Sequence, residues 1–176
     1  DVLEDIDLFY FEPSDVTGFI IYGIGVDDEL GVAVSAAGDI NSDGGADLIV
    51  GALYADPLSR TNAGSAYVYY GIPPPPVPTL PPTTGPTIVP SAMPSFAPTM
   101  PPLVGYHLYG ATLSEQSGSA VSDAGDVNGD GVGDIIIGAP QNDGDTVRGG
   151  LAYVVFGHTG TNTDFDLNEF TTGTSG

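Results

Sequence analysis

The stretch Asp39-Ile-Asn-Ser-Asp-Gly-Gly-Ala-Asp47 returns 87 residues later as Asp126-Val-Asn-Gly-Asp-Gly-Val-Gly-Asp134. Both nine-residue segments place side-chain oxygens at positions 1, 3, 5 and 9, and a glycine at position 6. Calcium takes six to eight oxygen ligands in a flexible geometry, which an alternating acidic loop with a glycine turn can supply. The carboxylates also repel each other, by about 4 kcal/mol for a pair ~4 Å apart at an effective dielectric constant of ~20. The sequence therefore predicts two loops that close around a cation.

The acidic loops belong to a longer internal repeat. At the same offset, Tyr22-Gly23 matches Tyr109-Gly110, Ala33-Val34-Ser35 matches Ala120-Val121-Ser122, and Gly51-Ala52 matches Gly138-Ala139. Residues 64–71 parallel 150–157 with one residue of slippage, and Asp7-Leu8 with Phe11 reappears as Asp166-Leu167 with Phe170. The chain thus holds one full unit, a second unit and the opening of a third.

Each unit alternates short apolar stretches with turn residues, a pattern typical of strands. We expect strands near residues 19–23, 32–37, 47–52, 65–70, 106–110, 118–123, 134–139 and 151–156. The unbroken apolar runs 48–50 and 135–137 suit strands that are buried on both faces. No stretch of useful length shows the 3.6-residue period of an amphipathic helix. The sequence therefore predicts an all-β protein.

A proline-rich segment, residues 72–103, separates a first unit (1–71) from a second unit with the start of a third (104–176). Thirteen of the sixteen prolines lie in this segment, which contains no charged residue. Proline this dense disfavours helix and sheet and favours the extended polyproline II conformation. At ~3.1 Å per residue, the segment would span ~100 Å. We expect a semi-rigid linker.

The linker also carries a hydroxyl pattern that suggests glycosylation. From Pro78 onward a proline recurs at every fourth position, and a serine or threonine follows each one up to Pro98. No Asn-x-Ser/Thr acceptor occurs in the chain, so sugars would be O-linked to hydroxyls or to hydroxylated prolines. A bare spacer is the alternative. The candidate sites are Thr79, Thr83, Thr87, Ser91, Ser95 and Thr99, with Pro78, Pro82, Pro86, Pro90, Pro94 and Pro98.

Charge and composition exclude several classes of partner. Asp and Glu number 23 against two basic residues, which gives a formal charge of −21. Such a surface repels phosphate backbones and anionic lipid headgroups, so we expect neither nucleic acid nor membrane binding. The absence of cysteine excludes disulfides and thiolate metal sites. A chain that begins with Asp and has no long apolar run is expected to be a mature or excised piece without a membrane span.

Catalytic patterns are not evident in the sequence. His107 and His158 lack matching ligand spacing, and neither a Gly-x-Ser-x-Gly elbow nor a nucleophilic cysteine occurs. The best-ordered carboxylates lie in the two acidic loops, where ionised ligands are needed. We therefore expect a protein that is not an enzyme.

The order Tyr-Gly, Gly-x-Ala-Val-Ser, the acidic loop, an apolar strand and Gly-Ala resembles the FG-GAP repeats of integrin α-subunit β-propellers. The second unit carries Gly138-Ala139-Pro140 and Phe156-Gly157, whereas the first departs with Gly51-Ala52-Leu53 and Tyr70-Gly71. This resemblance implies a four-stranded antiparallel propeller-type blade per unit, with calcium in the hairpin loop between its first two strands. It also implies an extracellular or cell-surface setting and a non-catalytic role in adhesion or assembly. The proline segment is similar to the Pro-Ser/Thr-x-x stretches of hydroxyproline-rich and algal cell-surface glycoproteins.

Carried over residue by residue, the resemblance implies two calcium sites. Glycine or valine at position 7 would contribute only its backbone carbonyl. The ligands would be Asp39, Asn41, Asp43, Gly45 and Asp47 in the first loop, and Asp126, Asn128, Asp130, Val132 and Asp134 in the second.

Propellers of this family close a ring of about seven blades, whereas this chain has two, and the second lacks an outer strand. The chain could be a slice of a larger propeller, its strand Phe19–Tyr22 could complete its own second blade, or that strand could complete a neighbour's blade. The last case gives a head-to-tail filament through open blade edges. The sequence therefore favours a calcium-stabilised extracellular structural glycoprotein that self-associates. The alternative is an integrin-like adhesion fragment that recognises a protein or a carbohydrate.

Overall fold

The computed structural model describes residues 19–74, 104–141, 149–160 and 163–170. By its internal contacts the chain divides into two units, Asp1–Tyr22 with Pro76–Pro102, and Gly23–Pro75 with Leu103–Gly176. The candidate glycosylation sites between residues 78 and 99 lie outside the described residues. Residues 19–23, for which we expected a strand, are described and form none, so that expectation is wrong.

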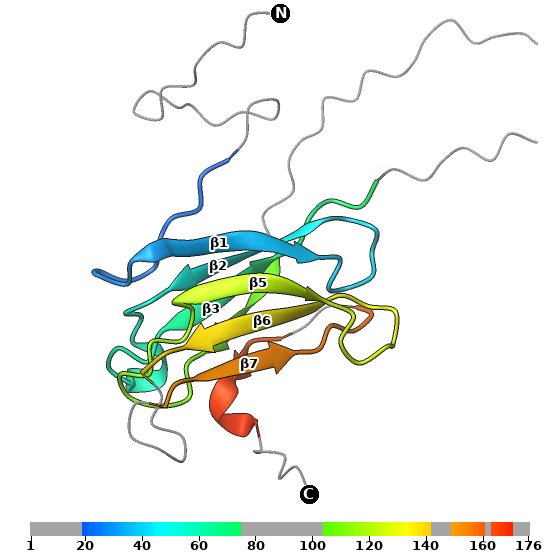
Figure 1. Cartoon of the computed structure of the whole chain (residues 1–176). Helices are drawn as coiled ribbons and strands as arrows, with labels where there is room; N and C mark the ends of the chain where they lie inside the picture. The colour runs from blue at the N-terminus through cyan, green and yellow to red at the C-terminus, as the bar shows by residue number, and fades with distance from the viewer. Residues whose placement is uncertain (1–18, 75–103, 142–148, 161–162, 171–176) are drawn as a thin grey trace, which may run out of the picture. The chain divides into compact units, whose positions relative to one another are not determined.

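The described strands all lie in the unit Gly23–Pro75 with Leu103–Gly176 and form two sheets (Figure 1). Seven of the eight expected strands are present within a residue or two of their expected bounds. In chain order the strands are β1 (Leu30–Gly38), β2 (Asp47–Ala52), β3 (Ser65–Tyr69), β4 (Gly105–Tyr109), β5 (Ala120–Gly125), β6 (Asp134–Ala139), β7 (Leu151–Val155) and β8 (Phe165–Asp166). Two short 3-10 helices, η2 (Pro57–Ser59) and η3 (Leu167–Glu169), complete the described elements.

The first sheet has the order β1-β2-β3-β4-β8 and the second the order β5-β6-β7. All neighbours pair antiparallel except β4 and β8, which run parallel. The predicted all-β fold with antiparallel blades is therefore confirmed. We call β1–β4 blade 1 and β5–β7 blade 2.

Blade 1 draws its strands from both sides of the proline-rich segment. β3 ends at Tyr69 and β4 begins at Gly105, yet the two strands pair side by side, with Tyr67 opposite His107. The counterpart of β4 ahead of blade 1 is the segment 18–22, which lies 87 residues earlier. The outer strand of a blade thus comes from the beginning of the next repeat.

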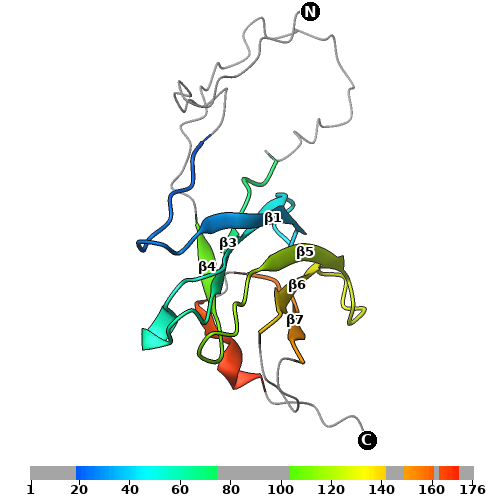
Figure 2. The ribbon, with the colours of Figure 1, turned by 60° about the vertical axis from the view of Figure 1, so that its left-hand side comes forward.

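The core lies between the two blades. Both views show β5 beside β1, so the sheets meet through one face each (Figure 1, Figure 2). Fully burying an isoleucine or leucine side chain stabilises the fold by about 1.5–3 kcal/mol. The large buried side chains of this core include Ile40, Ile49, Val68, Tyr106, Leu108, Ile135, Ile137 and Leu167.

The opposite faces of the sheets are only partly covered. Leu48 is 39% exposed and Val34, on the same face of blade 1, is 69% exposed. Ile136 of blade 2 is partly exposed, unlike its neighbours Ile135 and Ile137. The expectation that the runs 48–50 and 135–137 are buried on both faces therefore holds only in part, because Val50 is 7% exposed whereas Leu48 and Ile136 keep exposed surface.

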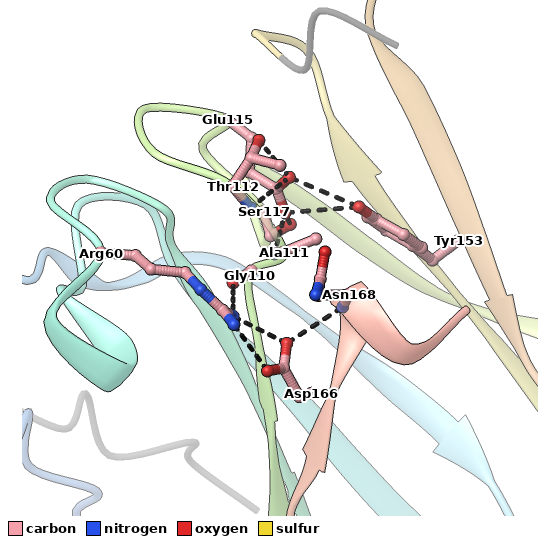
Figure 3. Close-up of polar contacts among 9 residues, drawn as sticks. All are labelled: Arg60, Gly110, Ala111, Thr112, Glu115, Ser117, Tyr153, Asp166 and Asn168. Carbon is pink, nitrogen blue, oxygen red and sulfur yellow. Dashed lines mark hydrogen bonds and ion pairs between the residues drawn. The ribbon is translucent and has the colours of Figure 1, made fainter. Parts of the chain in front are cut away.

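The segment after blade 2 folds back onto blade 1, which the sequence pattern did not predict. The Asp164 carboxylate accepts hydrogen bonds from the His107 N–H (2.9 Å) and the Tyr109 hydroxyl (2.7 Å). The Arg60 guanidinium donates to both Asp166 oxygens at 2.7 Å and to the Gly110 carbonyl at 2.9 Å (Figure 3). These hydrogen bonds from Arg60 hold the pKa of Asp166 below its usual value.

The Arg60–Asp166 pair supplies a first prediction. We expect Asp166→Asn to lower the free energy of unfolding by about 1–3 kcal/mol at neutral pH, because a charge-assisted bidentate pair is lost. A carboxyl whose pKa is lowered by folding stabilises the fold above the unfolded-state pKa of ~3.9. That contribution is lost as the pH falls through the lower folded value, so the difference between wild type and variant should shrink below pH ~4.

Denaturant titrations at pH 7 and at decreasing acid pH measure this difference. Arg60→Met and the double variant complete a double-mutant cycle, whose coupling energy isolates the pair from the other contact of Asp166 with the Asn168 N–H. A coupling energy of zero would show that the pair contributes nothing to stability.

Candidate functional site

The two acidic loops occupy equivalent positions in the two blades. Residues 39–46 connect β1 to β2, and residues 126–133 connect β5 to β6. Each loop is therefore the hairpin between the first two strands of its blade. The structure places the ten predicted ligand residues in these two loops and in the first residue of the strand that follows each one.

In the first loop, the side chains at positions 1, 3 and 5 converge. The Asp43 N–H donates to Asp39 Oδ1 and to Asn41 Oδ1, each at 3.0 Å. Asn41 Nδ2 donates to Asp43 Oδ2 at 2.9 Å. The Gly44 and Gly45 N–H groups donate to Asp39 (3.0 Å) and Asp43 (2.6 Å). Backbone donors that the sequence argument omitted therefore offset part of the repulsion among the carboxylates.

The second loop repeats this pattern contact by contact. The Asp130 N–H donates to Asp126 Oδ1 and Asn128 Oδ1, each at 3.0 Å, and Asn128 Nδ2 donates to Asp130 Oδ2 at 2.8 Å. The Gly131 and Val132 N–H groups donate to Asp126 (2.9 Å) and Asp130 (2.8 Å). The two loops thus have the same hydrogen-bond geometry, although the residues at positions 2, 4, 7 and 8 differ between them.

The aspartate at position 9 fastens each loop to the end of its blade's third strand. Asp47 is 1% exposed and accepts the N–H groups of Ile40 (2.9 Å) and Gly71 (2.8 Å). Asp134 is 0% exposed and accepts those of Val127 (2.7 Å) and Gly157 (2.9 Å). Burial raises the pKa of Asp47, although the two N–H donors oppose that shift. Position 9 therefore has a structural role in each blade.

This contact explains why glycine follows the aromatic residue at the end of each third strand. A Cβ on Gly71 would lie 2.1 Å from the Ala46 carbonyl oxygen, and a Cβ on Gly157 would lie 2.1 Å from that of Gly133. Both distances are far inside van der Waals contact. Only glycine lets the backbone approach closely enough to donate to the buried carboxylate.

The donor set of each loop fits calcium. Positions 1, 3 and 5 converge, and with position 9 and the carbonyl of position 7 they offer only oxygen ligands, which a hard cation prefers. Asp39, Asn41, Asp43, Gly45 and Asp47 would hold one ion; Asp126, Asn128, Asp130, Val132 and Asp134 would hold the other. The carboxylates face backbone N–H groups, and the described residues contain no preformed cluster of three or more acidic or histidine side chains. Binding would therefore require these side chains to turn toward the ion.

A buried glutamate, Glu115, joins the two blades and was missed by the sequence analysis. It is 0% exposed and accepts hydrogen bonds from the Ala111 N–H (2.6 Å), the Thr112 N–H (3.0 Å) and the hydroxyls of Thr112 and Ser117 (Figure 3). The Tyr153 hydroxyl of β7 reaches it at 3.4–3.5 Å. A carboxylate with this many donors fixes the connector between β4 and β5 against blade 2.

The repeat itself contains the signal that could have identified Glu115. Its counterpart 87 residues earlier is Asp28, which accepts the Gly25 N–H at 2.8 Å. An acid that returns at the same place in both connectors, outside the calcium pattern, indicates a structural carboxylate. The two histidines, for which the sequence showed no ligand spacing, lie in different parts of the fold. His107 is in β4, and His158 follows β7.

Comparison with known proteins agrees with this architecture. The family model of the FG-GAP repeat matches residues 30–69 and 118–155. These two stretches contain β1–β3 and β5–β7 with both acidic loops. No curated protein matches the chain. The family model of the FG-GAP repeat thus covers two stretches of the chain, each of which forms the first three strands of a propeller-type blade. No helix among the described residues is long and apolar enough to cross a membrane.

The loops supply a second prediction, which separates position 5 from position 9. We expect Asp43→Ala to lower the melting temperature in calcium and to have much less effect once calcium is chelated. Ligand binding at 100 times the dissociation constant stabilises a fold by about 2.7 kcal/mol. Asp47→Ala should instead destabilise under both conditions, because it leaves two backbone N–H groups without their acceptor, at about 1–3 kcal/mol each.

Thermal unfolding with millimolar calcium and with a chelator measures both effects. Glu169→Ala, which removes the same charge from an exposed residue outside the loops, is the matched control. Equal losses for Asp43→Ala with and without calcium would count against ligation by this residue.

Proposed function

We propose that this chain is a non-catalytic, calcium-stabilised structural protein of the extracellular space, whose FG-GAP blades assemble with further copies into a filament or matrix. One observation carries the proposal: blade 2 ends in an edge strand with no partner among the described residues. Blade 1 has four strands and a fifth segment on its edge, whereas β7 pairs only with β6.

An edge strand of this kind is a site for pairing with another chain. The outer edge of β7 presents backbone N–H and C=O groups that a further strand would satisfy. Next to it, Phe156 is 53% exposed. On blade 1, Val32 and Val34 expose 46% and 69% of their surface. Exposed apolar side chains on both blades support stacking of further blades on each end.

The remaining parts of the proposal suit an extracellular assembly. A formal charge of −21 keeps such a particle soluble and repels nucleic acid. The loop carboxylates face backbone N–H groups and would have to turn to bind an ion, which favours weak binding. Weak binding suits the millimolar calcium outside cells, where modules bind calcium with dissociation constants of about 10⁻⁴–10⁻³ M. The proline-rich segment 72–103 connects β3 to β4, which pair within blade 1, so a glycosylated stem at this point of the sequence is compatible with an intact blade.

A ligand-binding role, as in integrin-type propellers, is the second candidate. It is supported by the match to the FG-GAP repeat in both units. In that case the blades would present a recognition surface for a protein or a carbohydrate and would not need to assemble.

The third prediction tests assembly against ligand binding. We expect the full chain in millimolar calcium to form regular fibres in electron micrographs and to sediment as a broad, concentration-dependent series of species. Chelation of calcium should shorten the fibres, because the blades lose stability. Dispersed monomers at all concentrations would contradict the structural proposal, and their binding to a glycan or protein would favour the second candidate.

The fourth prediction concerns the stem. Mass analysis of native material should show hexose-spaced heterogeneity on a peptide that spans residues 72–103, which holds all twelve candidate sites. A peptide from residues 30–69, which lacks the Pro-Ser/Thr-x-x pattern, is the internal control and should have a single mass. An unmodified mass for the stem peptide would remove the glycan from the proposal and leave a bare spacer.

A further inference from the structure

The connectors that lead into the two blades have the same conformation. Residues 23–31 precede blade 1 as 110–118 precede blade 2. In both, an acid accepts the N–H three residues before it: Asp28 from Gly25 (2.8 Å) and Glu115 from Thr112 (3.0 Å). Positive φ angles recur in pairs 87 residues apart, at Asp27 and Ser114 (65° and 59°), Glu29 and Gln116 (53° and 61°), and Gly31 and Gly118 (96° and 84°).

The second connector begins where an outer strand ends. Residues 105–110, Gly-Tyr-His-Leu-Tyr-Gly, contain β4, the outer strand of blade 1. Residues 18–23, Gly-Phe-Ile-Ile-Tyr-Gly, hold the same place before the first connector. The leading glycine matters, because a Cβ on Gly105 would lie 1.8 Å from the Val68 carbonyl oxygen of β3. Gly18 meets that requirement, so the segment 18–22 has the sequence of an outer strand.

The matching acceptor is the outer edge of β7, which no strand among the described residues covers. β7 is the counterpart of β3, to which β4 pairs. In blade 1 the Tyr70 N–H donates to the Val104 carbonyl. Because the N–H groups of every second residue of a strand point to the same neighbour, those of Ala66 and Val68 also point toward β4. By the same alternation, the N–H groups of Ala152 and Val154 point to the open edge of β7.

A cavity next to this edge has room for a side chain of the added strand. It measures about 320 Å³ and is lined by apolar and aromatic groups that include Leu108, Val155, Phe165 and Phe170. The register of β3 with β4, transferred to β7, places Ile20 opposite Tyr153 and Phe19 opposite Val154. Tyr153 and Val155 pack on the core between the blades. A residue opposite Tyr153 points to the same side, toward the cavity.

We propose that the outer strand of blade 2 is supplied by residues 18–22 of a second copy of this chain, which pair antiparallel with β7. This proposal rests on the assembly function proposed above and specifies the strand pairing through which the copies assemble. Two copies joined in this way bring blade 1 of one copy onto the exposed face of blade 2 of the other. Repetition of the contact gives a head-to-tail array, because the donor and acceptor surfaces lie on different parts of the chain.

The direction of the connectors argues for a second copy over self-pairing. The connector 110–118 leads from β4, the outer strand of blade 1, to β5, the first strand of blade 2. The connector before β1 has the same conformation, so in the order of the repeat residues 18–22 correspond to the outer strand of a blade that precedes blade 1. Their own blade 2 instead follows blade 1 in the chain, so the blade that precedes blade 1 is the blade 2 of another copy.

Two variants divide the contact into its halves. Gly18→Val blocks the donated strand. A side chain at position 18 would clash with the Val154 carbonyl, just as a Cβ on Gly105 would clash with the Val68 carbonyl in blade 1. Thr17→Val is the matched control. Val154→Pro blocks the acceptor by removing an N–H that faces outward, a position where an edge strand tolerates proline. Sedimentation and light scattering in millimolar calcium measure molar mass. Each blocked variant alone should be a monomer, and their equimolar mixture should give a dimer of twice the monomer mass and nothing larger.

A synthetic peptide of residues 17–24 provides a readout that does not depend on the proline variant. Added to Gly18→Val protein, it should bind and raise the melting temperature, whereas the same peptide with valine at position 18 should not. If wild type assembles and Gly18→Val assembles equally well, the strand contact is wrong while the assembly function stands. If wild type stays monomeric and Gly18→Val lowers its melting temperature, the strand completes its own blade and the proposal fails. If wild type stays monomeric and the peptide does not bind, both proposals fail.

Discussion

A buried carboxylate at the ninth position of each acidic loop holds the architecture together. Asp47 and Asp134 each accept one N–H from the loop and one from the glycine after the third strand. This fastens the first hairpin of a blade to its third strand at one end of the sheet. The acidic loop is therefore part of the folding unit as well as a candidate cation site. An ion bound there would act on contacts that already define the blade.

A blade pair of this kind cannot satisfy all of its own surfaces. One face of each sheet is buried against the other, but the opposite faces keep partly exposed apolar side chains, and β7 lacks an outer partner among the described residues. Closed propellers solve this by ring closure, and linear arrays solve it by adding copies. In blade 1 the outer strand already arrives from the far side of a long proline-rich segment. The pairing of β3 with β4 thus does not require a short connection between the two strands, and a strand from another copy could make the same contacts.

The two repeats also show which acids are structural. Asp28 and Glu115 are offset by 87 residues, like the loop aspartates, but they pin the connectors and not the hairpins. Arg60 adds a contact that has no repeat counterpart among the described residues. It follows η2 and connects the end of β4, through the Gly110 carbonyl, to β8, through Asp166. With so few basic residues in the chain, the buried carboxylates Asp47, Glu115 and Asp134 are stabilised by backbone N–H groups and hydroxyls.

The sequence by itself determined the strands of both repeats, the hairpin position of the acidic loops and the equivalence of the two units. These features follow from local patterns: short apolar stretches between turn residues, glycine turns and a spacing of 87 residues. The tertiary structure alone decided that β4 completes blade 1, that β8 lies against it, that residues 19–23 form no strand within the chain, and that Glu115 is buried between the blades. Such features depend on which distant segments meet, and a local pattern carries no information about the partner that a strand edge or a carboxylate will find.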